Sequence, residues 1–343
     1  MSSKDQTTVD ASVDAVPRTH LATRSHARDA LGQRQLIVVT GKGGVGKSAL
    51  TGVLARHLAA RGRRVLALEV DRRETLQRWF GVPPSGGEIL EVSGELTEGL
   101  DGSLHLQNLQ PSRVVDWVVE KKVKIGPLVR RIQNSPVYQR FVEGAPGLGE
   151  LAILGHALRV VRGDAAGAPP IDTVILDAPA TGHGIFLLTA PALVADTIGQ
   201  GPFSELAREV ADFVADPGRC GMVVVTLAEE MPVQEALELR QNLVRVMDRG
   251  PELLVVNGLY PPLPDGVGEA QPADGIAVDD FRDLWFRRRR VNDSELDRLG
   301  REWPGPRLDL PLLPIDEGPE LLAALEEHFS RLLESAPVEE DRS

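Results

Sequence analysis

A glycine-rich segment from Thr40 to Ala49, TGKGGVGKSA, has the residue types and the spacing of a phosphate-binding loop. Glycines allow backbone angles that a Cβ would block, so successive N–H groups can converge on phosphate oxygens. Lys47 would neutralise the β- and γ-phosphates, and the Ser48 hydroxyl would bind Mg²⁺. A simple strand-to-helix turn is the alternative. The sequence thus predicts a site for ATP and Mg²⁺, with these nucleotide-binding residues: Gly41, Lys42, Gly43, Gly44, Val45, Gly46, Lys47, Ser48 and Ala49.

Two carboxylates follow apolar runs further along the chain. Asp71 ends the segment VLALEVD, and Asp177 ends TVILD. Hydrolysis of ATP needs a group that orients the attacking water and a carboxylate near Mg²⁺. We assign Asp71 to polarising the water and Asp177 to holding Mg²⁺ through a bound water. Glu69 is the competing carboxylate within the first run, and a helix N-cap is the alternative role of Asp71.

The loop after Asp177 contains Pro179 and the triplet Thr181–Gly182–His183. Its position after a predicted buried strand places it beside the expected γ-phosphate, as a candidate switch. His183 either relays a proton or makes a structural hydrogen bond, and the sequence favours the structural role.

Short apolar runs alternate with helix-length segments, which is the pattern of a mainly parallel sheet flanked by helices. Several runs are apolar at successive positions, as in strands that are covered on both faces. The predicted strands are Gln35–Thr40, Val65–Val70, Leu104–Leu109, Thr173–Asp177, Met222–Leu227 and Leu253–Asn257. Amphipathic helices are expected after the glycine-rich loop and over Pro319–Glu334. The predicted fold class is therefore α/β, a P-loop NTPase with a twisted, mainly parallel sheet.

Composition divides the chain into a body and two tails. Residues 1–34 and 335–343 are polar and are predicted to be flexible tails, with the ATPase domain over 35–334. Two regions, about 111–162 and 259–304, break the alternation of strands and helices. We expect them to pack together as an inserted α-helical subdomain. The apolar positions of 111–162 would form its core or, alternatively, an open groove for a client.

The overall charge and the cysteine count exclude several classes of function. The net charge is −12, which disfavours binding to nucleic acid. Cys220 is the only cysteine, so no zinc or metalloid site built from cysteine pairs is expected. No apolar run reaches about 18 residues, and we expect a cytoplasmic protein. Arg287–Arg290 is the only basic run, and it is either a solvated helix face or a docking patch for an acidic partner.

The second lysine of the loop gives the sequence a resemblance to a particular class. Lys42 follows Gly41 directly, and the resulting GKGGVGKS resembles the deviant Walker A motif. MinD and ParA partition ATPases, nitrogenase iron protein and arsenical pump-driving ATPases share this motif. The resemblance implies that Lys42 is catalytic and reaches the nucleotide of a partner subunit, in a homodimer or a heterodimer with a paralogue. The alternative is that Lys42 lies in solvent.

A narrower resemblance comes from Asp177, the triplet Thr181–Gly182–His183 and the apolar segment GIFLLTAPALV. Together they resemble the arsenical pump-driving, or anion-transporting, ATPase family, which includes the targeting factor for tail-anchored proteins. The family form D-T-A-P-T-G-H reads D-A-P-A-T-G-H here, and E-V-D stands where the family has S-T-D-P-A. The resemblance implies that Asn257 bonds the adenine base and that Pro311 belongs to a loop over it. Glu229 and Glu235 match the family's P-E…E-T segment.

These observations predict a cytoplasmic, dimeric ATPase that couples hydrolysis of Mg·ATP to conformational change. Its partner would be an unknown client protein or a membrane protein. One alternative is a positioning ATPase of the MinD or ParA type, although the acidic C-terminus and the net charge disfavour it. Another is a weakly hydrolysing scaffold that nucleotide holds in one conformation.

Overall fold

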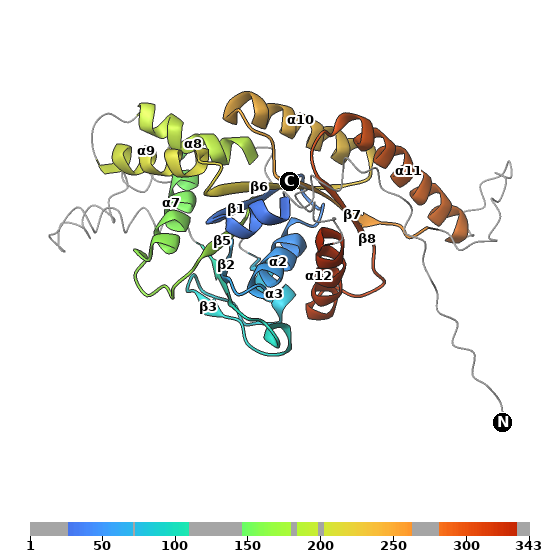
Figure 1. The fold of residues 1–343 in the computed structure, drawn as a ribbon, viewed down its shortest axis with the longest axis horizontal. Helices are drawn as coiled ribbons and strands as arrows, with labels where there is room; N and C mark the ends of the chain where they lie inside the picture. Colours follow the sequence, from blue (N-terminus) through green and yellow to red (C-terminus); the bar gives the residue numbers. More distant parts are fainter. Residues whose placement is uncertain are drawn as a thin grey trace, which may run out of the picture.

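A single sheet of eight strands runs through the part of the chain that the computed structural model describes, which is residues 27–70, 73–109, 146–179, 184–197, 202–262 and 281–334. The strand order is β3-β4-β2-β5-β1-β6-β7-β8 (Figure 1). Every neighbouring pair is parallel except β3 with β4. The predicted α/β class with a mainly parallel sheet is confirmed.

The six predicted strands are present, with ends shifted by a few residues at most. The strands are β1 (Leu36–Thr40), β2 (Arg64–Glu69), β3 (Leu90–Glu91), β4 (Ser103–Asn108), β5 (Thr173–Asp177), β6 (Cys220–Leu227), β7 (Leu253–Leu259) and β8 (Arg307–Pro311). The sequence analysis did not predict β3 and β8. β3 has two residues only, and β8 alternates apolar with polar residues because it lies at the edge of the sheet.

Helices cover both faces of this sheet. They are α2 (Lys47–Ala59), α3 (Thr75–Phe80), α7 (Leu148–Arg162), α8 (Gly184–Thr197), α9 (Pro202–Ala215), α10 (Glu230–Met247), α11 (Phe281–Glu302) and α12 (Pro319–Glu334), with a short 3₁₀ turn at Glu95–Thr97. None of the helices in the described ranges is long and apolar enough to cross a bilayer.

Successive strand residues face opposite layers of helices, which explains the unbroken apolar runs. Ile37 and Val39 of β1 pack in the cluster that contains α2 and α12, whereas Leu36 and Val38 pack in the cluster that contains α7, α8 and α9. β1 therefore contributes to two cores, and the central strands β1 and β5 are buried along their whole length.

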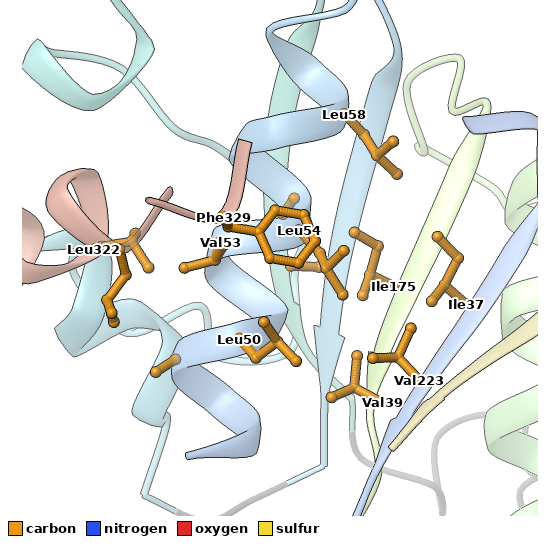
Figure 2. Packing of buried hydrophobic residues seen from close by; sticks show 14 of the residues in the cluster. Ile37, Val39, Leu50, Val53, Leu54, Leu58, Ile175, Val223, Leu322 and Phe329 are labelled. Atoms are coloured by element: carbon orange, nitrogen blue, oxygen red, sulfur yellow. The ribbon is translucent and has the colours of Figure 1, made fainter. Parts of the chain in front are cut away.

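Helix α2 holds the glycine-rich loop against the sheet (Figure 2). Its residues Leu50, Leu54 and Leu58 lie in one buried cluster with Ile37 and Val39 of β1. Burying each such leucine contributes roughly 1.5–3 kcal/mol to folding. The start of α2 is thus fixed relative to the end of β1.

Helix α12 lies beside α2 on the same face of the sheet, where it also contacts β8 (Figure 1). Leu322 and Phe329 pack there, and a Cβ built on Gly52 would lie 2.7 Å from Leu322 Cδ1. The apolar face of α12 is therefore buried against α2.

The described residues differ from the predicted N-terminal tail and from the predicted helical subdomain. Residues 27–33 are helical, and Ala27 and Leu31 are buried, so the tail predicted over 1–34 does not extend through this part. Alanine and leucine at helical spacing supply an apolar stripe that packs against the core.

The described parts of the predicted helical subdomain do not pack together either. α7 belongs to the layer over β2, β5 and β1, and α11 lies by α10 at the other end of the sheet (Figure 1). Residues 110–145 and 263–280 of those regions lie outside the described residues.

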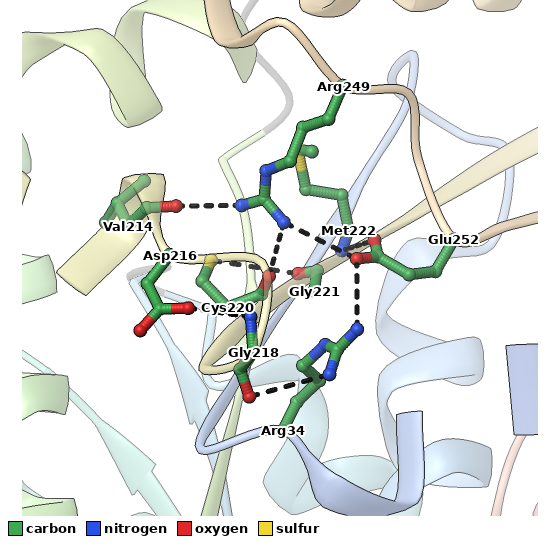
Figure 3. Close-up of polar contacts among 9 residues, drawn as sticks. All are labelled: Arg34, Val214, Asp216, Gly218, Cys220, Gly221, Met222, Arg249 and Glu252. Atoms are coloured by element: carbon green, nitrogen blue, oxygen red, sulfur yellow. Dashed lines mark hydrogen bonds and ion pairs between the residues drawn. The ribbon is translucent and has the colours of Figure 1, made fainter. Parts of the chain in front are cut away.

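A cluster of charged side chains ties together the amino ends of β1, β6 and β7 (Figure 3). Glu252 accepts a hydrogen bond of 2.5 Å from Met222 N–H, and its Oε1 lies 3.4 Å from Arg249 and 3.8 Å from Arg34. Arg249 also donates to the carbonyls of Cys220 and Val214, at 2.6 and 2.7 Å. Burial raises the pKa of the Glu252 carboxyl, and the backbone hydrogen bond and the two arginines oppose that shift. The cluster lies at the amino ends of the strands, whereas the glycine-rich loop lies at their carboxyl ends.

Candidate functional site

The glycine-rich loop lies where the chain leaves the sheet toward two different faces. β1 lies between β5 and β6. It leads into α2 on one face, whereas β6 leads into α10 on the other face. Ligands of open α/β sheets bind in the crevice that such a divergence creates at the carboxyl ends of the strands.

Two glycines of the loop are required by close contacts as well as by their backbone angles. Gly41 has φ +150°, and a Cβ there would lie 2.2 Å from the carbonyl oxygen of Val225. Gly46 has φ +94°, and a Cβ there would lie 2.2 Å from Asn257 Nδ2. Because no side chain fits at either position, the loop can present its backbone N–H groups to an anion.

Lys47, the first residue of α2, lies within this loop. Its side chain is buried, and its Nζ donates a 3.0 Å hydrogen bond to the carbonyl of Lys42. Burial lowers the pKa of Lys47, and the carboxylate of Asp177 opposes that shift. An anionic ligand would stabilise the ammonium form in the same way.

Ser48 and Asp177 meet at the carboxyl edge of the sheet. Ser48 Oγ donates a hydrogen bond of 2.5 Å to Asp177 Oδ2, and Asp177 is 9% exposed. Asp177 ends β5, paired with Val39 of β1 on one side and with Glu69 of β2 on the other. A hydroxyl and a carboxylate are hard oxygen ligands of the kind that Mg²⁺ binds. The donor set therefore fits the predicted metal.

Glu69, the competing carboxylate, has a different role. It is 1% exposed at the end of β2, and its Oε2 accepts a 3.1 Å hydrogen bond from Leu76 N–H at the start of α3. A carboxylate at a helix N-terminus is favoured by the helix dipole. Asp71, and Thr181, Gly182 and His183 of the candidate switch, lie outside the described residues.

Asn257 of β7 contacts the glycine-rich loop itself. Its Nδ2 donates a 3.0 Å hydrogen bond to the carbonyl of Val45. The family resemblance implies a contact of Asn257 with the adenine base, whereas its contact with Val45 has no signal in the sequence. Pro311, the other residue assigned to the adenine region, ends β8 and is partly exposed.

Lys42 extends to the outer side of the loop. Its Nζ lies 2.8 Å from Glu235 Oε1 of α10, and both side chains are about 40% exposed (40% and 38%). The two residues line a cavity of about 540 Å³ between the loop, Gly184 at the start of α8, and α10. Glu235 was noted in the sequence only as part of a matching segment, because a contact between residues so far apart has no local signal.

A separate metal site built from His, Cys, Asp or Glu side chains is not found among the described residues. Among the described residues, no three His, Cys, Asp or Glu side chains converge on one point. Cys220, the first residue of β6, is fully buried, and burial raises the pKa of its thiol to about 12. The thiolate form that binds soft metals is therefore strongly disfavoured.

Comparisons with known proteins agree with this geometry. Residues 34–202 match the family profile described as anion-transporting ATPase. The chain is 30% identical over 213 residues to "ATPase BagA" of Mycobacterium tuberculosis, which is 62% of each chain. It is 27% identical over 236 residues to "Arsenical pump-driving ATPase" of Acidiphilium multivorum, which is 65% of this chain and 39% of that protein. It is 24% identical over 173 residues to "ATPase GET3C" of Arabidopsis thaliana, which is 47% of this chain and 42% of that protein. The matched part is thus less than two thirds of each relative.

Proposed function

Because the chain carries an anion-transporting ATPase domain over residues 34–202, we propose that it binds ATP with Mg²⁺ and hydrolyses it as a dimer. The observation that supports this most directly is the meeting of Lys47, Ser48 and Asp177 at the carboxyl edge of β1 and β5. A buried cation, a hydroxyl and a carboxylate lie next to the glycine-rich loop. This combination suits the phosphates of a nucleotide and a hard divalent cation.

Each residue has a defined part in this proposal. Backbone N–H groups of the loop bind the phosphate oxygens, and the Lys47 ammonium faces the β- and γ-phosphates. Ser48 would hold Mg²⁺ directly and Asp177 would hold it through a water, and the bound ion would supply positive charge next to the phosphates. Asp71 orients the attacking water.

Lys42 completes the site of a second subunit. Its side chain points away from its own loop into the cavity beside α10 and keeps 40% of its surface exposed, so it is accessible to a partner. A cation supplied in this way resembles an arginine finger, which accelerates phosphoryl transfer by roughly 10³- to 10⁵-fold. The second subunit is another copy of this chain or a paralogue.

Nucleotide binding can move the helices that meet a partner protein. The cavity beside the loop is walled by the start of α8 and by one face of α10. A partner subunit that enters this region would therefore contact both helices. We propose that opening and closing of the dimer moves them, and that a client or a membrane-protein partner senses the change.

The C-terminal helix gives no support to a lipid-bound positioning ATPase. The apolar residues of α12, among them Leu322 and Phe329, are buried against α2. They are not free to enter a bilayer. Its exposed side carries Glu327 and Glu334, which an anionic lipid surface would repel.

Mixing two inactive variants tests the proposal. Lys47→Ala should lose ATP binding in calorimetry, and Lys42→Ala should bind ATP but lose turnover by about 10³-fold. A Lys42→Ala subunit keeps its loop, and a Lys47→Ala subunit keeps the lysine that acts on a partner. Their equal mixture should regain roughly a quarter of the wild-type turnover, since half of the randomly paired dimers are mixed and each has one complete site. Absence of recovery would rule out the action of Lys42 across subunits, and unchanged ATP binding in Lys47→Ala would rule out the site.

A further inference from the structure

The first half of α11 projects beyond the β7–β8 edge of the sheet (Figure 1). Residues 281–290, FRDLWFRRRR, contain five arginines and one aspartate, in a chain whose net charge is −12. This is a strongly basic element on an acidic protein. The ATPase site described above makes no use of it.

Contacts on one side of α11 hold this half in place. Trp285 Nε1 donates to the carbonyl of Pro261 at 3.2 Å, and its ring packs edge-on against Tyr260 with centroids 5.9 Å apart. Arg289 donates to the carbonyl of Tyr260 at 2.6 Å. Asn292 accepts from Tyr260 N–H and donates to the carbonyl of Ala228, both at 2.9 Å. The helix is therefore presented in a fixed orientation.

A second face of α11 is exposed in the part of the chain that the structure describes, and it mixes apolar with basic residues. Leu284 and Val291 are 53% and 44% exposed, and they are one heptad apart. Arg287 and Arg288 lie between them on the same face, at helical spacing. Arg288 pairs with Glu229 of α10 at 3.0 Å. Arg287 is exposed and pairs with none of the described residues.

We propose that this face of α11 docks an acidic amphipathic helix of another protein. Leu284 and Val291 have the spacing of successive positions in a helix–helix seam, and the arginines stand beside that seam where oppositely charged residues of a partner helix would lie. Arginine forks bind carboxylates through two parallel hydrogen bonds, which adds geometric specificity.

Charge favours a helix over a membrane as the occupant. An anionic bilayer is extended, and it would face the acidic remainder of the molecule as well as the basic helix. A single acidic helix contacts only the projecting half of α11. The proposed occupant therefore gains the attraction of the arginines without the repulsion from the body of the protein.

A designed peptide tests this surface in the full-length protein. The probe is a labelled synthetic helix of about three heptads, with leucine at the seam positions and glutamate elsewhere. The same peptide with lysine for glutamate is its control. Fluorescence anisotropy should show that the wild type binds the glutamate peptide, that added salt weakens this binding, and that the lysine peptide does not bind.

Charge reversal at the proposed surface, in the double variant Arg287→Glu/Arg288→Glu, should weaken binding of the glutamate peptide by about tenfold or more. Leu284→Ser should also weaken binding of this peptide. Arg331→Glu, which reverses an exposed charge on α12, should not weaken it. Equal binding by all variants, or no binding by the wild type, would overturn the proposal. So would preferential binding of the wild type to phosphatidylglycerol vesicles, or a self-association that the double variant loses in sedimentation. A thermal unfolding midpoint equal to that of the wild type serves as the folding control for each variant.

Discussion

The Lys42 ammonium is paired within its own chain, 2.8 Å from the Glu235 carboxylate on α10. The lysine that we propose to act on a partner's nucleotide therefore has a competing anion close by. Exposed ion pairs of this kind contribute about 0.2–1 kcal/mol. A partner's triphosphate, with several negative charges, can displace Glu235 at little cost. The pair would hold Lys42 back until a nucleotide-loaded partner arrives.

Removing this competitor should increase turnover. In Glu235→Gln, Lys42 no longer has to leave a carboxylate, so steady-state ATP turnover at subsaturating protein concentration should rise about 1.5- to 5-fold, the factor that corresponds to an exposed pair. Glu238→Gln, which changes another acidic residue of the same cavity, is the control and should have little effect. A turnover as low as that of Lys42→Ala would instead assign Glu235 a direct part in the reaction.

The contact between Ser48 and Asp177 predicts how magnesium affects nucleotide binding. Asp177→Asn keeps the shape of the side chain but removes the charge that would hold the metal-bound water. The affinity for Mg²⁺ should fall about 10- to 100-fold, while binding of ATP in EDTA should change little. Titration of a fluorescent ATP analogue with and without Mg²⁺ measures both. Asp172→Asn, just before the other end of the same strand, is the matched control. Equal Mg²⁺ dependence in the two variants would contradict the assignment.

The hydrogen bond from Asn257 to the carbonyl of Val45 predicts that loss of this side chain lowers the affinity for nucleotides whatever their base. Asn257→Ala leaves this carbonyl without its partner and loosens the loop, so affinity should fall about 5- to 30-fold, for GTP as well as ATP. A residue that contacts only adenine would affect ATP alone. Asn242→Ala, which lines the cavity beside Lys42 and does not contact Val45, is the control. Competition binding with both nucleotides distinguishes the two roles.

How much of this site the sequence predicts depends on how local the signal is. The loop from Gly41 to Ser48 is contiguous, and Gly41, Gly44 and Gly46 have the positive φ angles that favour glycine, so the motif alone predicts it. Asn257 approaches Val45 from a strand 212 residues away, which no local pattern reveals. The pairing of Lys42 with Glu235 is nonlocal in the same way.

The fold likewise has elements that local sequence patterns predict and contacts that they do not predict. Continuous apolar runs predict buried parallel strands such as β5. β8 lies at the sheet edge, and its sequence RLDLP alternates apolar with polar residues over five positions, which is too weak a pattern to predict a strand. Helical periodicity predicts that α7 and α11 each bury one face. It does not say against which neighbour, and so the expected joint subdomain is not found in their described parts.

The cluster around Glu252 predicts a loss of stability without a loss of function. Glu252→Gln keeps an acceptor for Met222 N–H but leaves Arg34 and Arg249 without their shared carboxylate in a largely buried place. The free energy of unfolding in urea should fall by about 2–4 kcal/mol. ATP affinity should be unchanged, because the cluster lies at the opposite edge of the sheet. Glu320→Gln, on the exposed start of α12, should cost little, and an equal loss in both variants would contradict this role.

His156 of α7 predicts a dependence of stability on pH. Its Nε2 lies 2.8 Å from Gln107 Oε1, and burial, assisted by Arg159, lowers its pKa from 6.5 to about 4. Below about pH 6.5 the unfolded chain therefore takes up a proton that the folded protein does not. The stability that this histidine contributes is present above pH 6.5 and is lost as the pH falls toward 4, by about 1.4 kcal/mol per pH unit.

Urea unfolding at pH 8 and at pH 5 measures this contribution. The wild type should lose about 2 kcal/mol more between these pH values than His156→Gln, which cannot take up a proton. The carboxylates titrate in both proteins, and their share cancels in the comparison. His328→Gln on α12 is the control for the loss of a histidine elsewhere in the chain. A slope in His156→Gln equal to that of the wild type would mean that His156 is protonated in the folded protein, and that its contact with Gln107 does not require the neutral ring.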